Sequence, residues 1–234
     1  MDGIDFGAGL FGRLRAAAGA EWTGYVRHAF VLQLGQGSLP ERCFKRFLVQ
    51  DYLFLIHFAR AYGLAVAKSS TLDDIRAAAA GLDAILAELP LHTGYCKGWG
   101  LDEAAMAAEP EAPATLAYTR YVMDVGLSGD LLDLTAALMP CVAGYAEIGQ
   151  ALLADPATVL DGNPYAAWLL TYDSPAYKDG VRAALCKLEE LGRRLGADSR
   201  FPALVRIFTT ATRLEAAFWQ MGLDAPAEPA QGAG

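Results

Sequence analysis

Cys141 is the residue whose type and setting first suggest chemistry. It follows Pro140 in the segment ALMPCVAGYAEIG, which otherwise has the composition of an apolar helix. A proline inside a helix removes one backbone hydrogen bond and bends the helix axis. Tyr145, four residues further on, shares a helical face with the thiol. A cysteine in such a helix is most often a core residue, whereas a nucleophilic thiol needs a polar neighbour, which here would have to come from another helix.

Two carboxyl side chains lie in equally apolar segments. Asp51 belongs to FKRFLVQDYLFLIHF and Glu215 to TTATRLEAAFWQMGL. A buried carboxylate is costly unless it is paired or bound to something polar. Asp51 therefore either pairs with an arginine or tyrosine of the core or lines a pocket, which Phe54 would help to form. Phe218 shares a face with Glu215, and the residues four positions before and after this glutamate carry no opposite charge.

The other polar residues give weaker signals. Four of the ten tyrosines in largely apolar segments are Tyr118, Tyr121, Tyr145 and Tyr172. The three histidines are too few and too scattered for a metal or haem site, and the four cysteines are isolated. No Glu-x-x-His pair occurs, which is the arrangement that a di-iron helical bundle uses. We therefore expect neither a metal nor a cofactor.

The elements that must position these residues are predicted to be helices. Helical periodicity dominates the chain, and no segment alternates as a half-buried strand does. Ser38 is expected to cap a long helix that runs to about Lys68, whose apolar middle places it in the core. Thr71 is expected to open the next helix, and Pro90 is expected to end it.

The pattern continues to the end of the chain, with about eight helices in total. Further helices are predicted over residues 114–126, 175–196 and 201–223, and the segment 9–34 also has a helical apolar period. Asp130 is expected to cap the helix that contains Cys141, and Ser174 a later helix. We predict an all-α, single-domain helical bundle over residues 1–223, followed by a flexible tail over residues 224–234.

Composition narrows the possible partners. The 234-residue chain has a formal net charge of −8 and no stripe of lysine and arginine. Nucleic-acid binding requires cations that neutralise phosphates, so no nucleic-acid partner is expected. The N-terminus lacks a basic region before a hydrophobic segment, and no apolar run is judged long enough to span a membrane. With isolated cysteines as well, we expect a cytoplasmic protein that has no membrane partner.

Taken together, these segments resemble the TenA / thiaminase II family from about Arg27 to Leu223. The blocks that carry the likeness are HAFVLQLGQGSLPERCFKRFLVQDYLFL, ATLAYTRYV, ALMPCVAGYAEIG, NPYAAWLLTYDSPAY and RLEAAFWQMGL. Their order and spacing match the family, apart from a few extra residues in DPATVLDGNP. The resemblance implies a haem-oxygenase-like helical bundle without haem, usually assembled as a homotetramer.

The resemblance also implies an activity in thiamine salvage. This is the hydrolysis of 4-amino-5-aminomethyl-2-methylpyrimidine to the hydroxymethyl pyrimidine and ammonia, with thiamine hydrolysed in the same way. It implies that Cys141 is the nucleophile, that Glu215 donates and accepts protons, and that Asp51 holds the aminopyrimidine edge. The substrate-binding residues implied beside Asp51 are Phe54, Tyr118, Tyr145, Tyr172 and Phe218. Phe54 stands where the family often has tyrosine, so stacking is kept but a hydroxyl contact is lost.

Two other functions are compatible with such a pocket. A non-catalytic pyrimidine-binding or regulatory protein of the same fold would have no need of the thiol. A haem-oxygenase-like oxidase would need iron ligands, and the histidine supply is poor. The sequence therefore favours a cysteine-dependent hydrolase whose partners are a small pyrimidine or thiamine substrate and further copies of the chain.

Overall fold

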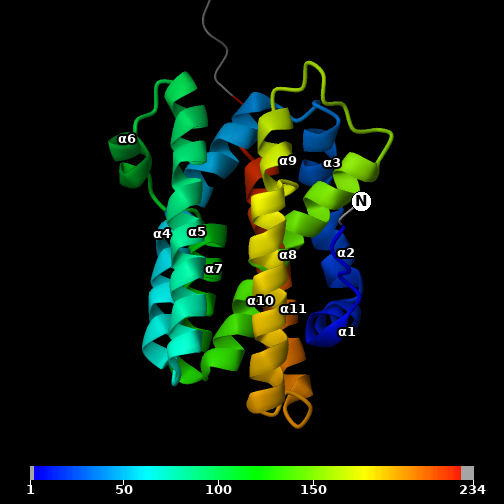
Figure 1. Ribbon diagram of the computed structural model, residues 1–234. Coiled ribbons are helices and arrows are strands. Elements are labelled where there is room, and N and C mark those ends of the chain that lie inside the picture. Colours follow the sequence, from blue (N-terminus) through cyan, green and yellow to red (C-terminus); the bar gives the residue numbers. More distant parts are fainter. Residues whose placement is uncertain (1–2, 228–234) are drawn as a thin grey trace, which may run out of the picture.

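The computed structural model describes residues 3–227 and shows eleven helices in that range, with no strand among those residues (Figure 1). The first three helices occupy much of the segment 9–34, and six longer helices follow or alternate with short ones. The helices are α1 (Gly9–Ala18), α2 (Ala20–Val26), α3 (Ala29–Gly35), α4 (Glu41–Lys68), α5 (Leu72–Gly98), α6 (Glu103–Ala108), α7 (Pro113–Ser128), α8 (Leu131–Ala154), α9 (Ala166–Tyr172), α10 (Pro175–Arg194) and α11 (Phe201–Leu223). The predicted all-α fold is confirmed.

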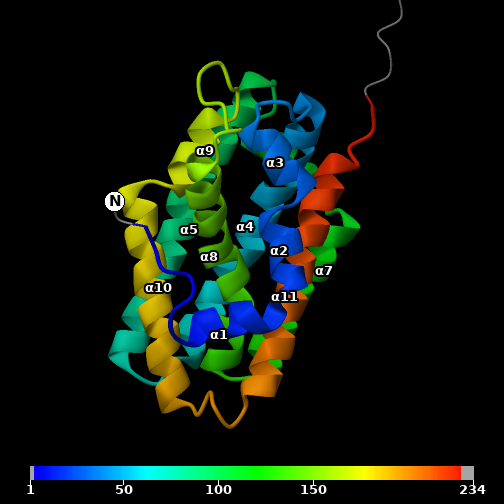
Figure 2. The same cartoon turned by 90° about the vertical axis from the view of Figure 1, so that its right-hand side faces the viewer.

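Four helices, α4, α7, α8 and α11, form the centre of the bundle. Each of them packs against the other three. Helix α5 lies along α4 and α10 lies along α8, so the two cover the bundle on the outside (Figure 1). Helix α1 crosses one end of the bundle against α11 and α10, as Figure 2 shows. The four central helices, with α5, α10 and α1 around them, thus enclose the centre of the molecule.

Side-chain caps define the helix starts that the sequence predicted best. Thr71 accepts a hydrogen bond from the backbone of Asp74 at the start of α5. Asp130 and Asp133 form a reciprocal capping box at the start of α8. Ser174 caps α10 in the same manner. In each case the side-chain oxygen satisfies a backbone N–H that lacks a partner within the helix.

Two predicted boundaries are wrong, and both involve proline. The residue at the N-cap of α4 is Pro40 and not Ser38, whose hydroxyl donates instead to the carbonyl of Gln33. Pro90 does not end α5, which continues to Gly98. Pro90 takes a hydrogen-bond donor away from the carbonyl of Leu86, but Leu86 is 51% exposed, so water can replace that donor. Packing along α4 then carries the helix past the proline.

Helix α8 is the most apolar element of the bundle. By length and composition its 24 residues could cross a membrane, contrary to the expectation from the sequence. In the structure, 83% of its most apolar window is buried inside the molecule. The apolarity of α8 therefore reflects its central position in the bundle. The tail predicted to be flexible, residues 224–234, lies mostly outside the described residues.

Candidate active site

The residues that the sequence singled out come together in the centre of the bundle, although they lie far apart in the chain. Each central helix contributes: α4 carries Asp51 and Phe54, α7 carries Tyr118, α8 carries Cys141 and Tyr145, and α11 carries Glu215 and Phe218. Tyr172 joins them from the end of α9, which packs against α8. The site therefore exists only when all these helices have assembled.

Cys141, Glu215 and Tyr118 lie together and form one polar group. The thiol of Cys141 lies within hydrogen-bonding reach of the Glu215 carboxyl group. The hydroxyl of Tyr118 donates to Oε1 of Glu215 over 2.9 Å. Glu215 is only 2% exposed, so these two contacts replace the water that a carboxylate would otherwise bind. The polar neighbour that the thiol lacked in its own helix is thus supplied by α11.

The pKa values of Glu215 and of the Cys141 thiol are both raised. Burial, together with the charge of Asp51, raises the pKa of Glu215 from 4.5 to about 8, although the hydrogen bonds from Tyr118 and Cys141 oppose this. Burial and the neighbouring carboxyl groups of Glu215, Asp51 and Glu88 raise the pKa of the Cys141 thiol well above its ordinary value. In the resting protein at neutral pH, both Cys141 and Glu215 therefore hold protons.

The backbone next to Cys141 is fixed by a contact from α2. The hydroxyl of Tyr25 donates to the carbonyl of Pro140 over 3.2 Å. Gly144 makes room for this ring, because a Cβ atom at that position would lie 2.4 Å from Cε1 of Tyr25. Tyr25 is fully buried and its ring stacks against Trp219. One turn of α8 around the cysteine is therefore held from outside the helix.

Asp51 has a partner that the sequence did not predict. Oδ2 of this carboxylate lies 2.6 Å from Nε2 of His92, and both side chains are buried, with Asp51 4% and His92 0% exposed. The pairing expected for Asp51 in the core was with arginine or tyrosine, and the partner is instead a histidine of α5. His92 lies two residues beyond Pro90, where the sequence predicts the end of this helix, and α5 continues past that point.

Glu88, also on α5, lies inside the predicted helix but was not singled out as a site residue. It accepts a hydrogen bond from the hydroxyl of Tyr172, and burial raises its pKa. Glu88 and His92 are four residues apart and so share a helical face. The sequence did contain a signal that the helix continues past Pro90. Ile85, His92 and Cys96 are spaced by seven and four residues, which is a helical period, and the structure buries all three.

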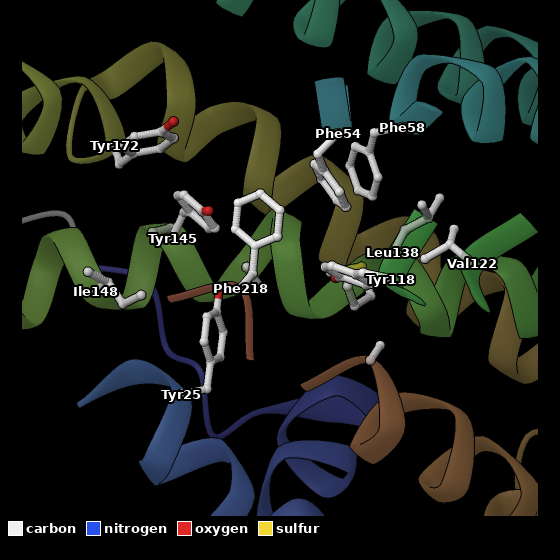
Figure 3. Close-up of a cluster of buried hydrophobic side chains, with 14 of the residues drawn as sticks. Tyr25, Phe54, Phe58, Tyr118, Val122, Leu138, Tyr145, Ile148, Tyr172 and Phe218 are labelled. Carbon is white, nitrogen blue, oxygen red and sulfur yellow. The ribbon is translucent and has the colours of Figure 1, made fainter. Parts of the chain in front are cut away.

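Aromatic rings enclose the polar groups. Phe54 packs against Tyr118 and Phe218, with ring centroids 4.9 and 5.7 Å away. Tyr145 and Tyr172 pack together at 4.9 Å. Figure 3 shows Phe218 between two groups of rings, with Tyr145 and Tyr172 on one side and Phe54 on the other. Flat rings at several angles around a few polar atoms suit a small aromatic ligand.

One side of the cluster retains accessible surface. The side chains that stay partly exposed there are Cys141, Tyr62, Glu88 and Tyr177. Their helices, α8, α4, α5 and α10, meet on the side of the bundle covered by α5 and α10. A separate hollow of about 470 Å³ between α5 and α6 is lined by residues from Pro90 to Glu103 and includes none of these side chains.

The described residues offer no group of three or more His, Cys, Asp or Glu side chains that could hold a metal ion. Both ring nitrogens of His92 already face oxygen atoms of the protein. Asp51 faces Nε2, and the carbonyl of Glu88 lies 3.3 Å from Nδ1. The chemistry available from these side chains is therefore that of a thiol, carboxyl groups and hydroxyl groups: nucleophilic attack, proton transfer and hydrogen bonding.

The chain is similar to proteins of known family. The model of the TENA/THI-4/PQQC family matches residues 15–225. A relative from Halalkalibacterium halodurans, named aminopyrimidine aminohydrolase, is 36% identical over 201 residues, which are 86% of this chain and 89% of the relative. The crystal structure of a TenA family transcription regulator from Silicibacter sp. TM1040 is 45% identical, with a TM-score of 0.86, and the match covers 92% of this chain and 96% of that one.

The fold is also shared with a more distant protein. A domain of unknown function with a heme oxygenase-like fold, from Shewanella denitrificans, matches with a TM-score of 0.71 at 14% identity. The match covers 93% of this chain and 91% of that domain. At this identity the likeness concerns the fold alone, and the predicted haem-oxygenase-like bundle is confirmed.

Proposed function

Because the chain belongs to the TENA/THI-4/PQQC family, as the resemblance in its sequence indicated, we propose that it is a hydrolase of aminopyrimidines in thiamine salvage. Its substrate is 4-amino-5-aminomethyl-2-methylpyrimidine, which it converts to the hydroxymethyl pyrimidine and ammonia, and it hydrolyses thiamine by the same route. Relatives from Halalkalibacterium halodurans, Bacillus subtilis and Helicobacter pylori are named aminopyrimidine aminohydrolase. We further propose that Cys141 is the nucleophile.

The observation that carries the proposal is the contact between the Cys141 thiol and the Glu215 carboxyl group. A thiol that lies beside a buried acid can pass its proton directly to the carboxylate without help from water. The two groups come from different helices, α8 and α11, and Tyr118 of α7 holds the acid in place. Nucleophilic catalysis needs such a base within hydrogen-bonding reach of the nucleophile.

The first half of the reaction releases the amine. The reaction starts from the form of the site in which Glu215 has lost its proton, a form that grows as pH rises toward the Glu215 pKa of about 8. The sulfur of Cys141 bonds to the electron-poor pyrimidine ring while the thiol proton passes to the Glu215 carboxylate. The electron pair brought into the ring expels the amine from the exocyclic methylene, and the amine takes the proton from Glu215 and leaves as ammonia. The ring then carries the sulfur and an unsaturated exocyclic carbon, and Glu215 is ionised again.

The second half adds water. A water oxygen bonds to the exocyclic carbon and gives a proton to Glu215. The electron pair returned to the ring expels the sulfur, which recovers this proton as the Cys141 thiol. The product is the hydroxymethyl pyrimidine, and both side chains return to the states in which they began. One carboxyl group thus serves as base and acid in turn, which a pKa near neutral favours.

The remaining residues bind and orient the substrate. Asp51 accepts hydrogen bonds from the amino edge of the pyrimidine, which fixes the ring against Cys141. Phe54 and Phe218 pack against the ring, and Tyr118, Tyr145 and Tyr172 complete the walls. Phe54 offers stacking without a hydroxyl contact and so affects the choice among substrates more than the covalent steps. Substrate enters on the side where Tyr62, Glu88 and Tyr177 keep accessible surface.

A turnover assay tests the proposal. The purified protein is assayed with the aminomethyl pyrimidine, with its formyl derivative and with thiamine, and ammonia or thiazole release is measured. We expect hydrolysis by the unaltered protein, and a loss of kcat of about 100-fold or more in Cys141→Ser, because a hydroxyl group is a far weaker nucleophile than a thiol. Cys186→Ser, which changes an exposed cysteine, is the matched control and should leave kcat unchanged.

The outcomes separate the competing functions. Pyrimidine binding without turnover by the unaltered protein would favour a non-catalytic or regulatory protein, as the name of the Silicibacter structure suggests for that relative. Near-normal kcat in Cys141→Ser would contradict the assigned nucleophile. We also infer, from the family resemblance, a homotetramer that works in the cytoplasm, and a native mass of a single chain would contradict that assembly.

A further inference from the structure

His92 holds a proton that its surroundings require. A neutral imidazole has one N–H donor, whereas both ring nitrogens of His92 face acceptors. Nε2 lies 2.6 Å from Oδ2 of Asp51, and Nδ1 lies 3.3 Å from the backbone carbonyl of Glu88. Both contacts can be hydrogen bonds only if the histidine carries two protons, or if one proton is shared with Asp51. Either way the His92–Asp51 pair holds one proton more than a neutral histidine beside an ionised aspartate.

The pair is rigid as well as protonated. His92 is 0% exposed, and its ring is held at both nitrogens, so the imidazole has one orientation. Asp51 uses Oδ2 for this contact, and among the described residues Oδ1 has no hydrogen-bond partner. The free oxygen is the one that can face a ligand. The imidazole therefore determines which way the carboxylate presents its second oxygen.

Charge gives the contact a second role. Burial alone lowers the pKa of His92, but the hydrogen bond and charge of Asp51 and the charge of Glu88 raise it. Asp51, Glu88 and Glu215 all act on the same region around Cys141. Among these carboxyl groups, the imidazole of His92 is the partner that can offer Asp51 an opposite charge.

We propose that His92 is a positioning residue of this site, whose contact with Oδ2 of Asp51 turns Oδ1 toward the amino edge of the substrate pyrimidine. This inference rests on the proposed function for the identity of the ligand. His92 itself does not touch the substrate. Its effect passes entirely through Asp51, so it belongs to substrate binding and orientation rather than to the transfer of protons at Cys141 and Glu215.

The experiment compares His92→Gln with the unaltered protein. Glutamine keeps a neutral N–H donor near the position of Nε2 but cannot carry the charge. We expect KM for the aminomethyl pyrimidine to rise about 10- to 100-fold, the range of a lost hydrogen bond to a charged group, with a smaller change in kcat. His92→Leu, which removes the donor as well, should raise KM further. His57→Gln is the matched control, because His57 pairs with Glu111 and not with Asp51. The KM of this variant should equal that of the unaltered protein.

A double-mutant cycle separates positioning from a merely structural role. If His92 acts only through Asp51, then His92→Gln should change KM less than about twofold in a protein that already carries Asp51→Asn. A loss through general damage to the fold would multiply with the loss from Asp51→Asn. Equal KM values for His92→Gln and the unaltered protein, or multiplicative effects in the cycle, would overturn the inference.

Binding measurements keep the two proposals apart. The affinity for the hydroxymethyl pyrimidine, measured by calorimetry, needs no turnover and should fall in His92→Gln by the same factor as KM rises. If the unaltered protein binds the pyrimidine but does not hydrolyse its amine, the proposed function fails and the role of His92 is still tested. If the unaltered protein hydrolyses the amine and His92→Gln binds normally, only the inference about His92 fails.

Discussion

At the scale of single residues, the proton shared by Cys141 and Glu215 sets the pH at which the site can react. The pair must hold one proton for the thiol to attack and for the acid to follow, whichever of the two atoms carries it. At low pH the pair holds two protons. The pKa of Glu215, about 8, marks the loss of the first, and the thiol pKa lies well above its ordinary value. The reactive form therefore grows as pH rises toward about 8.

Tyr118→Phe tests this assignment. The hydroxyl of Tyr118 stabilises the ionised form of Glu215 and so lowers its pKa, and its removal should raise that pKa further. We expect the rise of kcat/KM with pH to move upward by about one pH unit, the size expected of one hydrogen bond to a charged group. At pH 7 the variant should be about tenfold less active, and it should recover at higher pH.

The measurement is kcat/KM from pH 6 to 10. Tyr121→Phe is the matched control on the same helix, because the hydroxyl of Tyr121 donates to the carbonyl of Ile207 and not to Glu215. Titration of the substrate amine is common to all three proteins and cancels in the comparison. A rise at the same pH in Tyr118→Phe and the unaltered protein would contradict the role of this hydroxyl group.

A residue of the site could be predicted from the sequence where its polar side chain contrasts with the apolar segment around it. Asp51, Cys141 and Glu215 stood out because a polar or reactive side chain occurred in an apolar helix, and the structure brings all three together. His92 and Glu88 lie on a helix with little apolar contrast, beyond or beside a proline. Their importance depends on which helix packs against α4, and that is a property of the assembled bundle.

At the scale of elements, helix starts were predictable where a side chain caps them, and less so where proline is involved. Thr71, Asp130 and Ser174 cap as expected, since a local hydrogen bond decides the matter. Pro90 is tolerated within α5 because the carbonyl that loses its donor belongs to an exposed residue and the helix is held along α4. Local rules therefore fail at the positions where tertiary packing outweighs one lost hydrogen bond.

The contact between α2 and α8 leads to a prediction about Gly144. In Gly144→Ala the added Cβ atom would lie 2.4 Å from the ring of Tyr25, which is buried and cannot move freely. We expect the free energy of unfolding to fall by about 1–3 kcal/mol, as overpacking in a core generally causes. kcat should fall as well, because Tyr25 holds the carbonyl of Pro140 beside the nucleophile.

Urea unfolding and turnover check this together. Gly180→Ala is the matched control in α10, where the described residues leave open space around an added Cβ atom. It should stabilise the protein by up to about 1 kcal/mol, the ordinary gain of alanine over glycine in a helix, with no change in kcat. Equal stability of Gly144→Ala and Gly180→Ala would show that the close approach of Tyr25 does not constrain α8.

At the scale of the whole molecule, the bundle is stable despite the carboxyl groups it encloses. Asp51 is paired with His92, Glu88 accepts a hydrogen bond from Tyr172, and Glu215 lies in contact with Tyr118 and Cys141. Asp51 has a partner that can carry the opposite charge, whereas Glu215 is bound by a hydroxyl and a thiol. Ionisation of Glu215 thus places a charge in the core that only hydrogen bonds offset, which weakens the fold as a whole.

The stability of the protein should therefore fall as pH rises, and Glu215→Gln should remove much of that fall. The pKa of Glu215 is about 8 in the folded chain, against an ordinary value of 4.5. Its neutral form contributes fully to stability below pH 4.5, and this contribution is lost as pH rises to about 8. The loss amounts to about 5 kcal/mol at most. Urea unfolding at pH 5 and pH 9 measures this loss.

We expect the stability of Glu215→Gln, which cannot ionise at this position, to fall markedly less between these two pH values than that of the unaltered protein. Glu109→Gln, which changes an exposed carboxyl group, is the control and should behave like the unaltered protein. The same fall in all three proteins would mean that the buried acid of this site does not govern the pH dependence of the fold.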